Sequence, residues 1–213
     1  IRDENKPQTL TPLRLAQELT KNFELVADAT RISATNISVK HQQSVYAERG
    51  LFVDSNYFQF FDFELLEGDA LPALSAPNSV VLYQDFAEKY FGSSTGVIGN
   101  RLTVNGNEHQ VTAVIRRTRA PHTMPLTLLL PIESYFDLLP NQNWVEMWNF
   151  NATITFVKAP ELANASELAG LISQYYDARA RGTSSYKSYR VVLAEITKLY
   201  LDSETTRSLI PPG

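Results

Sequence analysis

The chain has 213 residues and a formal net charge of −4; 44% of its residues are hydrophobic and 20% are charged. This composition is typical of a folded globular protein with a buried core, and the scattered basic residues give no indication of a nucleic-acid partner. Cysteine is absent, which excludes a disulfide framework, a thiolate metal site and a cysteine nucleophile, and no apolar run is long enough for a membrane span or a signal peptide.

The first part of the chain predicts one helix and three strands. Thr11 followed by Pro12 is typical of a helix N-cap, and apolar residues at helical spacing extend the helix to about Leu25. The strands are expected from three alternating or β-branched stretches, at 26–33, 36–42 and 44–53.

The segment "FVDSNYFQFFDFELLEGDAL" (52–71) holds five of the eleven phenylalanines of the chain. Asp54 or Ser55 is placed to cap a short helix. The aromatic residues on one face of that helix are Tyr57, Phe58 and Phe61. An extended apolar stretch follows, and Gly68 suits the positive-φ turn that ends it.

Four carboxylates in this segment raise the question of a catalytic acid/base cluster: Asp62, Glu64, Glu67 and Asp69. Because they alternate with apolar residues, an extended backbone directs them away from the packed side. A catalytic carboxyl with a raised pKa requires burial or a like-charged neighbour in a cleft. The pattern predicts neither, so we expect a solvated edge and no catalytic residue; a carboxylate-dependent hydrolase is the less favoured hypothesis.

The middle of the chain predicts a helix-plus-hairpin unit. Its expected elements are a connector (71–78), a buried strand (79–82), a helix (83–91), a hairpin (101–115), and a strand with a short helical turn (126–136). Gly92 suits the end of the helix. Asn105-Gly106 is the preferred pair for a tight type I′ hairpin turn, and Pro131 ends the last strand.

The C-terminal part predicts further elements: a strand (149–157), a helix (165–180), a polar loop (181–188) and a last strand (189–201). The helix positions expected to face inward are Leu168, Leu171, Ile172, Tyr175 and Tyr176. The order of elements predicts an α+β protein in which both chain ends build one discontinuous domain around an inserted α+β unit.

No motif for metal, nucleophilic or phosphate chemistry is present. His41, His109 and His122 lack metal-site spacing, and we expect them at the surface. Ser184-Ser185 lacks a nucleophile elbow, and the glycine-containing stretch 92–100 precedes a hairpin rather than a helix. We therefore expect no metal, no cofactor and no enzymatic activity.

Trp144 and Trp148 allow two interpretations. They could line a sugar- or lipid-binding groove, or pack under the adjacent strand, and packing is the favoured reading. Phe58 and Phe61 are the other candidates for an interaction or packing role.

Three motifs occur in order between about residues 50 and 115: "FVDSNYFQFFDFELLEGDAL", "PNSVVLYQDFAEKYFG" and "VIGNRLTVNGNEHQVTAVI". In this order and spacing the chain resembles the extracytoplasmic core domain of MacB-type, FtsX-like ABC-transporter permeases. The stretch "VVLAEITKLYL" is similar to the closing strand of that family. Three positions depart from the family pattern: Tyr83 stands where a Ser or Thr cap is usual, Ala113 where Gly is usual, and Tyr200 where His is common.

The resemblance implies a periplasmic domain of a bacterial inner-membrane permease, and thus a segment of a longer protein. It implies a porter-like lobe from 1–70 and 149–213 with a sabre-like lobe inserted at 71–148. The implied function is non-catalytic mechanotransmission, in which cytoplasmic ATP hydrolysis drives periplasmic movement for the export or extraction of a peptide, lipoprotein or drug-like substrate.

The partners implied by the resemblance are the cytoplasmic ATPase of the transporter, a second permease copy or paralogue, and a periplasmic adaptor or lipoprotein. The alternative function is a stand-alone periplasmic module that binds a lipid, peptide or glycan through the tryptophan region.

Overall fold

The computed structural model describes residues 9–116, 128–161, 164–182 and 190–196. The chain divides into two compact units: unit 1 contains Ile1–Ala29 and Asn143–Gly213, and unit 2 contains Thr30–Gln142. Unit 2 is therefore an insertion between two halves of unit 1. It starts earlier in the chain than the sabre-like lobe expected at 71–148, and the assignment of porter and sabre lobes stays a prediction.

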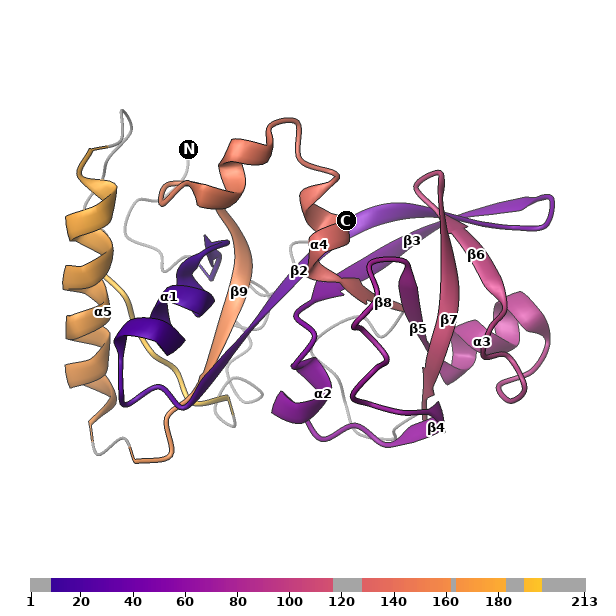
Figure 1. Ribbon diagram of the computed structural model, residues 1–213, viewed down its shortest axis with the longest axis horizontal. Coiled ribbons are helices and arrows are strands. Elements are labelled where there is room, and N and C mark those ends of the chain that lie inside the picture. The colour runs from indigo at the N-terminus through magenta and orange to yellow at the C-terminus, as the bar shows by residue number, and fades with distance from the viewer. Residues whose placement is uncertain (1–8, 117–127, 162–163, 183–189, 197–213) are drawn as a thin grey trace. The chain divides into compact units, whose positions relative to one another are not determined.

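Unit 1 contains two helices packed on a small antiparallel strand pair (Figure 1). Its elements are β1 (Thr11–Pro12), α1 (Leu15–Asn22), β9 (Asn151–Lys158) and α5 (Ala165–Ala180), with the 3-10 helix η1 (Gln142–Glu146) at its boundary. β1 pairs antiparallel with β9. The core of this unit is made of buried residues from α1, from α5 and from the segments that lead into β2 (Asp28–His41) and β9: Leu15, Ala16, Leu19, Val26, Ala29, Trp148, Leu168, Ile172, Tyr176 and Ala180.

The prediction that Thr11 caps a helix is wrong. Thr11 lies in β1 opposite Thr153, and its hydroxyl lies 2.6 Å from the Thr155 hydroxyl. The helix begins only at Leu15, and it ends at Asn22 rather than Leu25. The fixed φ of Pro12 suits the first turn of a helix and an edge strand equally well, and the pairing with β9 decides between them.

The helix predicted over 165–180 is confirmed as α5. Asn164 caps it, because its side-chain oxygen accepts a hydrogen bond of 3.0 Å from the Ser166 amide. Leu168, Ile172 and Tyr176 are buried, whereas Leu171 is 44% exposed. The inward direction predicted for Leu171 is therefore wrong, since the buried stripe follows the spacing of four residues.

The strand predicted over 189–201 is absent from its described part, residues 190–196. The rest of that prediction, and most of the loop predicted at 181–188, lie outside the described residues. Val191 and Leu193 nevertheless pack against the core of unit 1, and the Val191 amide donates a 2.9 Å hydrogen bond to the Ser173 hydroxyl. The apolar residues that suggested a strand are used here without a strand partner.

Unit 2 contains most of the strands. Its elements are β2 (Asp28–His41, which starts in unit 1), β3 (Ser44–Val53), α2 (Tyr57–Phe60), β4 (Leu65–Gly68), β5 (Ser79–Tyr83), α3 (Gln84–Phe91), β6 (Arg101–Val104), β7 (Asn107–Ile115), β8 (Leu128–Pro131) and α4 (Ile132–Phe136). The strands expected at 26–33 and 36–42 are one continuous strand, β2. Gly92, with φ +74°, ends α3 as predicted.

The strands of unit 2 close into a barrel (Figure 1). Within the described residues, pairing runs from β2 to β3, β8, β5, β7 and β6, and from β6 back to β2. β4 extends the sheet along the far end of β7. The side chains that fill the barrel alternate along the strands, except in β7, where a register shift opposite Val80 and Val81 interrupts the alternation. They are Ile37, Val39, Phe52, Val80, Leu82, Leu102, Val104, Val111, Val114, Leu128 and Leu130.

The hairpin predicted at 101–115 is confirmed as β6 and β7. Asn105 and Gly106 have φ values of 48° and 88°, as a type I′ turn requires. The turn also serves the barrel closure, because the Asn105 side-chain oxygen accepts a 2.9 Å hydrogen bond from the Ser38 amide on β2. A local turn signal thus contributes to the long-range pairing of β2 with β6.

Candidate functional site

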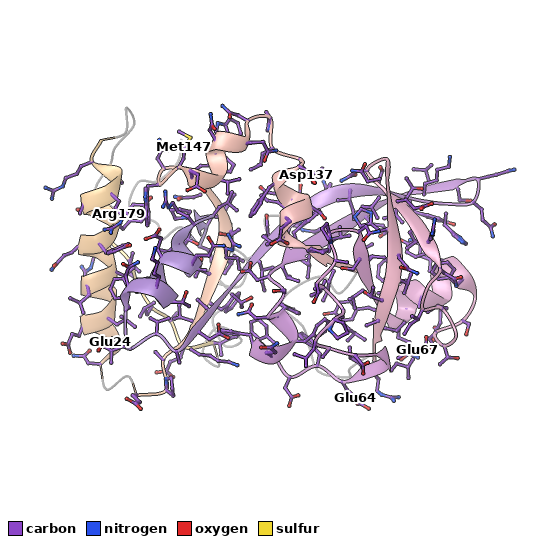
Figure 2. The ribbon with its side chains drawn as sticks, in the orientation of Figure 1. Glu24, Glu64, Glu67, Asp137, Met147 and Arg179 are labelled. Carbon is purple, nitrogen blue, oxygen red and sulfur yellow. The ribbon has the colours of Figure 1, made fainter. Side chains whose placement is uncertain are left out.

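The four carboxylates at 62–69 do not converge on one site. Glu67 accepts hydrogen bonds of 2.9 and 3.2 Å from the Gly96 and Val97 amides, while Glu64 pairs with Arg116 at 2.7 Å. Figure 2 shows Glu64 and Glu67 at separate places on the outer edge of unit 2. Asp62 and Asp69 are exposed. These positions fit anchoring of a loop and solvation of an edge, and they form no cleft for acid/base chemistry.

The aromatic residues of the same segment form a packed cluster. Tyr57 is 1% exposed and Phe58 9%, and the Tyr57 ring stacks on Phe63 at a centroid distance of 5.4 Å. Phe61 is half-buried and lies 5.1 Å from the Tyr57 ring. Phe63 reaches the Tyr83 ring at the end of β5. The structure therefore places both candidates, Phe58 and Phe61, within this aromatic cluster, which contacts the barrel through Phe63.

A buried ion pair lies at the start of this aromatic segment. Arg31, 3% exposed, donates from Nη2 to Asp54 Oδ1 at 2.6 Å and from Nε to Oδ2 at 3.0 Å. The Arg31 guanidinium also lies 5.6 Å from the ring centre of Phe136 on α4. Asp54 or Ser55 was predicted to cap α2, but the N-cap residue is Asn56, which makes no side-chain capping hydrogen bond. The Asp54 carboxylate binds Arg31 instead. The pair joins the first residues of unit 2 to its last helix.

The two tryptophans occupy different environments in unit 1. Trp148 is 7% exposed and packs edge-on against Tyr176 at 5.7 Å, and the Tyr176 hydroxyl donates to the Trp148 carbonyl oxygen at 2.5 Å. Trp144 is half-buried and contacts the Phe150 ring at 4.8 Å. The indole of Trp148 is thus part of the core rather than the wall of an open groove.

Charged side chains surround Trp148 and connect α1 to α5. The guanidinium of Arg14 lies 5.0 Å from the Trp148 ring centre. That of Arg179, which Figure 2 labels, lies 3.3 Å from the Tyr175 ring centre. Glu18 pairs with Arg14 at 3.0 Å and accepts a short hydrogen bond from the Tyr175 hydroxyl. We call these five side chains the α1–α5 network. The four-residue spacing of Arg14 and Glu18 could have indicated that ion pair, but not its partners on α5.

The α1–α5 network changes the acidity of its members. The hydrogen bond from Tyr175, and then that from Arg14, lower the pKa of Glu18 below its ordinary 4.5. Burial, together with the Glu18 carboxylate, raises the pKa of Tyr175 to about 12. Both shifts favour an ionised Glu18 and a protonated Tyr175, which is the arrangement that the hydrogen bond needs.

The histidines are not all at the surface. His109 is 5% exposed and lies in the barrel wall, so the surface position predicted for it is wrong. His109 lies opposite Leu102 in the hairpin. Because opposed residues of an antiparallel pair point to the same face, His109 shares the barrel interior with Leu102. His41 is half-buried beside the Phe91 ring, and His122 lies outside the described residues. In the described ranges, no three His, Asp or Glu side chains gather as metal ligands would.

The chain matches the family of MacB-like periplasmic core domains over residues 2–175. Comparison with the sequences of characterised proteins finds no match. Across the described residues, every helix is too short or too polar to cross a membrane.

Solved structures share the fold. A domain assigned to a permease protein from Porphyromonas gingivalis has a TM-score of 0.69 and 16% identity, over 91% of this chain and 86% of that one. The periplasmic region of MacB from Actinobacillus actinomycetemcomitans has a TM-score of 0.60 and 15% identity, over 83% and 77%. The extracellular domain of the ABC-type transporter YknZ from Gram-positive bacteria has a TM-score of 0.64 and 14% identity, over 88% and 91%.

The family match covers most of the chain, and the α+β fold agrees with it. The motif order from the aromatic segment to the hairpin, read from the sequence as a family likeness, is confirmed by this match. The chain belongs to the family of MacB-like periplasmic core domains.

Proposed function

We propose that this chain is the non-catalytic periplasmic domain of a MacB-type ABC-transporter permease, and that it transmits movement driven by ATP hydrolysis in the cytoplasm. The family match supports the transporter context. The movement would serve the export or extraction of a peptide, a lipoprotein or a drug-like molecule. The domain acts in this proposal as a lever, so its function depends on how rigidly each unit holds together.

The observation that carries this proposal is the discontinuous unit 1. The chain segments before and after the insertion meet in one core, and the α1–α5 network ties the first helix to the last one. Movement applied to either segment would then displace unit 1 as one body, because buried contacts and charge-assisted hydrogen bonds resist separation of the two helices. The chain connects unit 2 to unit 1 at Thr30 and at Gln142.

The partners in this proposal follow from the transporter context. A cytoplasmic ATPase supplies the energy, and a second permease copy or a paralogue completes the transporter. A periplasmic adaptor or a lipoprotein is the further expected partner. Each of these would bind the complete permease or its outer surface rather than a catalytic cleft.

A distance measurement in the complete permease with its ATPase tests the proposal. One spin label replaces Leu171, exposed on α5 of unit 1, and the other replaces Val45, exposed next to the β2–β3 turn of unit 2. We expect the label-to-label distance distribution to differ between the nucleotide-free and ATP-bound states. Labels at Gln17 and Leu171, both in unit 1, are the control and should keep one distribution.

Identical Val45–Leu171 distributions in all nucleotide states would contradict a mechanical role. A shift in the Gln17–Leu171 control would contradict the rigidity of unit 1. The alternative of a stand-alone binding module would use the half-buried Trp144, because the Trp148 ring is buried.

A further inference from the structure

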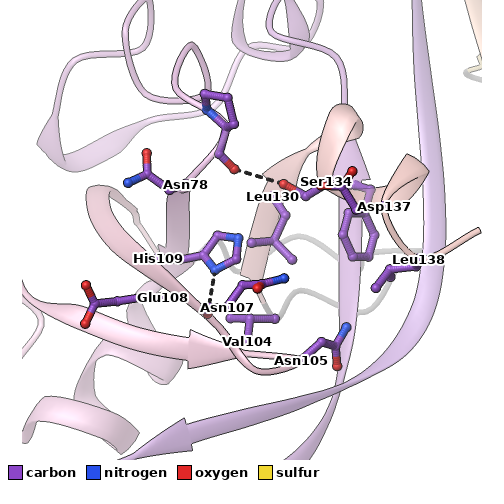
Figure 3. A pocket seen from close by; sticks show the side chains of 12 residues that line it. Asn78, Val104, Asn105, Asn107, Glu108, His109, Leu130, Ser134, Asp137 and Leu138 are labelled. Atoms are coloured by element: carbon purple, nitrogen blue, oxygen red, sulfur yellow. Dashed lines mark hydrogen bonds between the residues drawn. The ribbon is translucent and has the colours of Figure 1, made fainter.

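A pocket of about 210 Å³ opens at one end of the barrel in unit 2 (Figure 3). It lies where β6 ends and β5 and β7 begin, and α4 covers one side of it. Its apolar walls are Phe52, Val104, Leu130 and Leu138. Mouths of barrels are frequent ligand sites, but small-molecule pockets usually measure about 300–1,000 Å³. This pocket therefore suits one side chain of a partner better than a whole small molecule.

His109 provides a free acceptor inside the pocket. Its Nδ1 lies 3.1 Å from the Asn107 carbonyl oxygen, so Nδ1 carries the proton and Nε2 holds the lone pair of the neutral ring. The side chain is more than nine-tenths buried, and Figure 3 shows the ring pointing into the pocket towards Leu130. Among the described residues Nε2 has no hydrogen-bond partner. Burial lowers the pKa of His109, which keeps the ring neutral and Nε2 an acceptor near pH 7.

The charges that line the pocket are negative. Asp137 at the end of α4 is exposed, and no described residue forms an ion pair with it. Glu108 points to the other side of β7 and is paired with Arg101 at 2.6 Å, so it adds little net charge. The lining contains no lysine or arginine. A guest must therefore bring hydrogen-bond donors, and a positive charge would be favoured.

We propose that this pocket, the barrel-mouth pocket, binds an arginine side chain of a partner polypeptide. The aliphatic stem would lie on the apolar walls, and the guanidinium would donate to His109 Nε2 and to the Asp137 carboxylate. Arginine fits better than lysine because its planar fork offers five donors and loses less hydration on entering a partly apolar site. The proposal concerns unit 2 alone and holds whether or not the domain transmits movement.

Nuclear magnetic resonance on the full chain, labelled with 15N, tests this proposal. The probe is N-acetyl-arginine amide, and N-acetyl-citrulline amide is its uncharged control of nearly equal shape. We expect the arginine probe at millimolar concentration to shift the backbone amides of Asn78, Asn105 and Asn107. We also expect it to move the Nε2 resonance of His109, while that of His41 stays in place. The citrulline probe should bind at least about fivefold more weakly, which is the size of effect expected for the loss of a charge pair with an exposed carboxylate.

A matched pair of variants separates the pocket from general charge effects. Asp137→Asn removes the carboxylate at the rim and should weaken binding of the arginine probe about two- to fivefold. Glu133→Gln, on the same helix but outside the lining, removes the same charge and should leave the affinity unchanged. Both sites are exposed, so both variants should fold, which their amide spectra will show.

Three results would overturn the proposal. One is equal affinity for the arginine and citrulline probes. Another is an affinity that Asp137→Asn does not change. The last is a set of shifted amides that lies outside the barrel-mouth pocket, or no shifted amide at all.

Discussion

Arg31 and Asp54 form a two-pronged ion pair in which the guanidinium is almost fully buried and the carboxylate also accepts a 2.6 Å hydrogen bond from the Arg31 amide. The pair holds the beginning of β2 against the turn that precedes α2. Arg31 also reaches Phe136 on α4, so one side chain links three segments of unit 2. The pair lies where the chain enters unit 2, and we expect it to contribute to the folding stability of that unit.

Removal of one partner from this pair should destabilise unit 2 strongly. We expect Asp54→Ala to lower the free energy of unfolding by about 3–5 kcal/mol, because it leaves the Arg31 charge buried without a counter-charge. Glu64→Gln, which breaks the exposed pair with Arg116, should cost less than about 1 kcal/mol. Chemical denaturation followed by circular dichroism measures both values. Equal costs for the two variants would contradict the role given to Arg31 and Asp54.

Gly68 is a second position where a small change should be costly. Its φ is +92°, and a Cβ atom there would lie 2.5 Å from the Thr112 carbonyl oxygen. Gly92 also has a positive φ, but a Cβ atom there meets nothing within 4 Å. We expect Gly92→Ala to cost about 1–2 kcal/mol of backbone strain and Gly68→Ala clearly more, since the clash with the β7 backbone adds to that strain. Thermal unfolding of the two variants tests this order.

The α1–α5 network predicts an acid-sensitive contribution to stability. The folded-state pKa of Glu18 is lowered, so its contribution is fully present above its ordinary pKa of 4.5 and is lost as pH falls through the lowered value. We expect Glu18→Gln to cost about 1–2 kcal/mol at pH 7 and much less at pH 3. Both tryptophans lie in unit 1, so denaturation followed by their fluorescence reports on this unit.

Glu24 provides the control for this measurement, because it is an exposed glutamate of the same unit (Figure 2). Glu24→Gln should leave the stability unchanged at both pH values. If the cost of Glu18→Gln were the same at pH 3 and pH 7, the ionised carboxylate would not be the source of the stabilisation.

His109 predicts a second pH-dependent contribution to stability, which comes from a basic group in unit 2. Its pKa is lowered from 6.5 by burial, so the unfolded chain binds the proton more tightly than the folded one. The stability of unit 2 should therefore fall as pH drops below about 6.5 and continue to fall until the lowered pKa is reached. We expect His109→Gln to flatten this dependence between pH 8 and pH 5, measured by hydrogen exchange of β7 amides. A slope that His109→Gln leaves intact would exclude His109 as its origin.

The sequence by itself determined the features whose cause is local. The Asn105-Gly106 turn, the left-handed end of α3 at Gly92 and the extent of α5 follow from backbone preferences and from side-chain spacing within a few residues. The alternation at 62–69 likewise indicated correctly that Asp62, Glu64 and Asp69 are exposed, whereas Glu67 is half-buried and anchors a loop. The family likeness also rested on such local motifs in a fixed order.

Tertiary structure decided the features that depend on partners far away in the chain. Thr11 and Pro12 form a strand because β9 is there to pair with them, and Asp54 leaves its capping role because Arg31 offers a buried charge. His109 is buried because β6 closes the barrel against β2, and its register then directs the ring inward. Each of these outcomes depends on pairing and desolvation energies between distant segments, which exceed the local preferences that the sequence pattern displays.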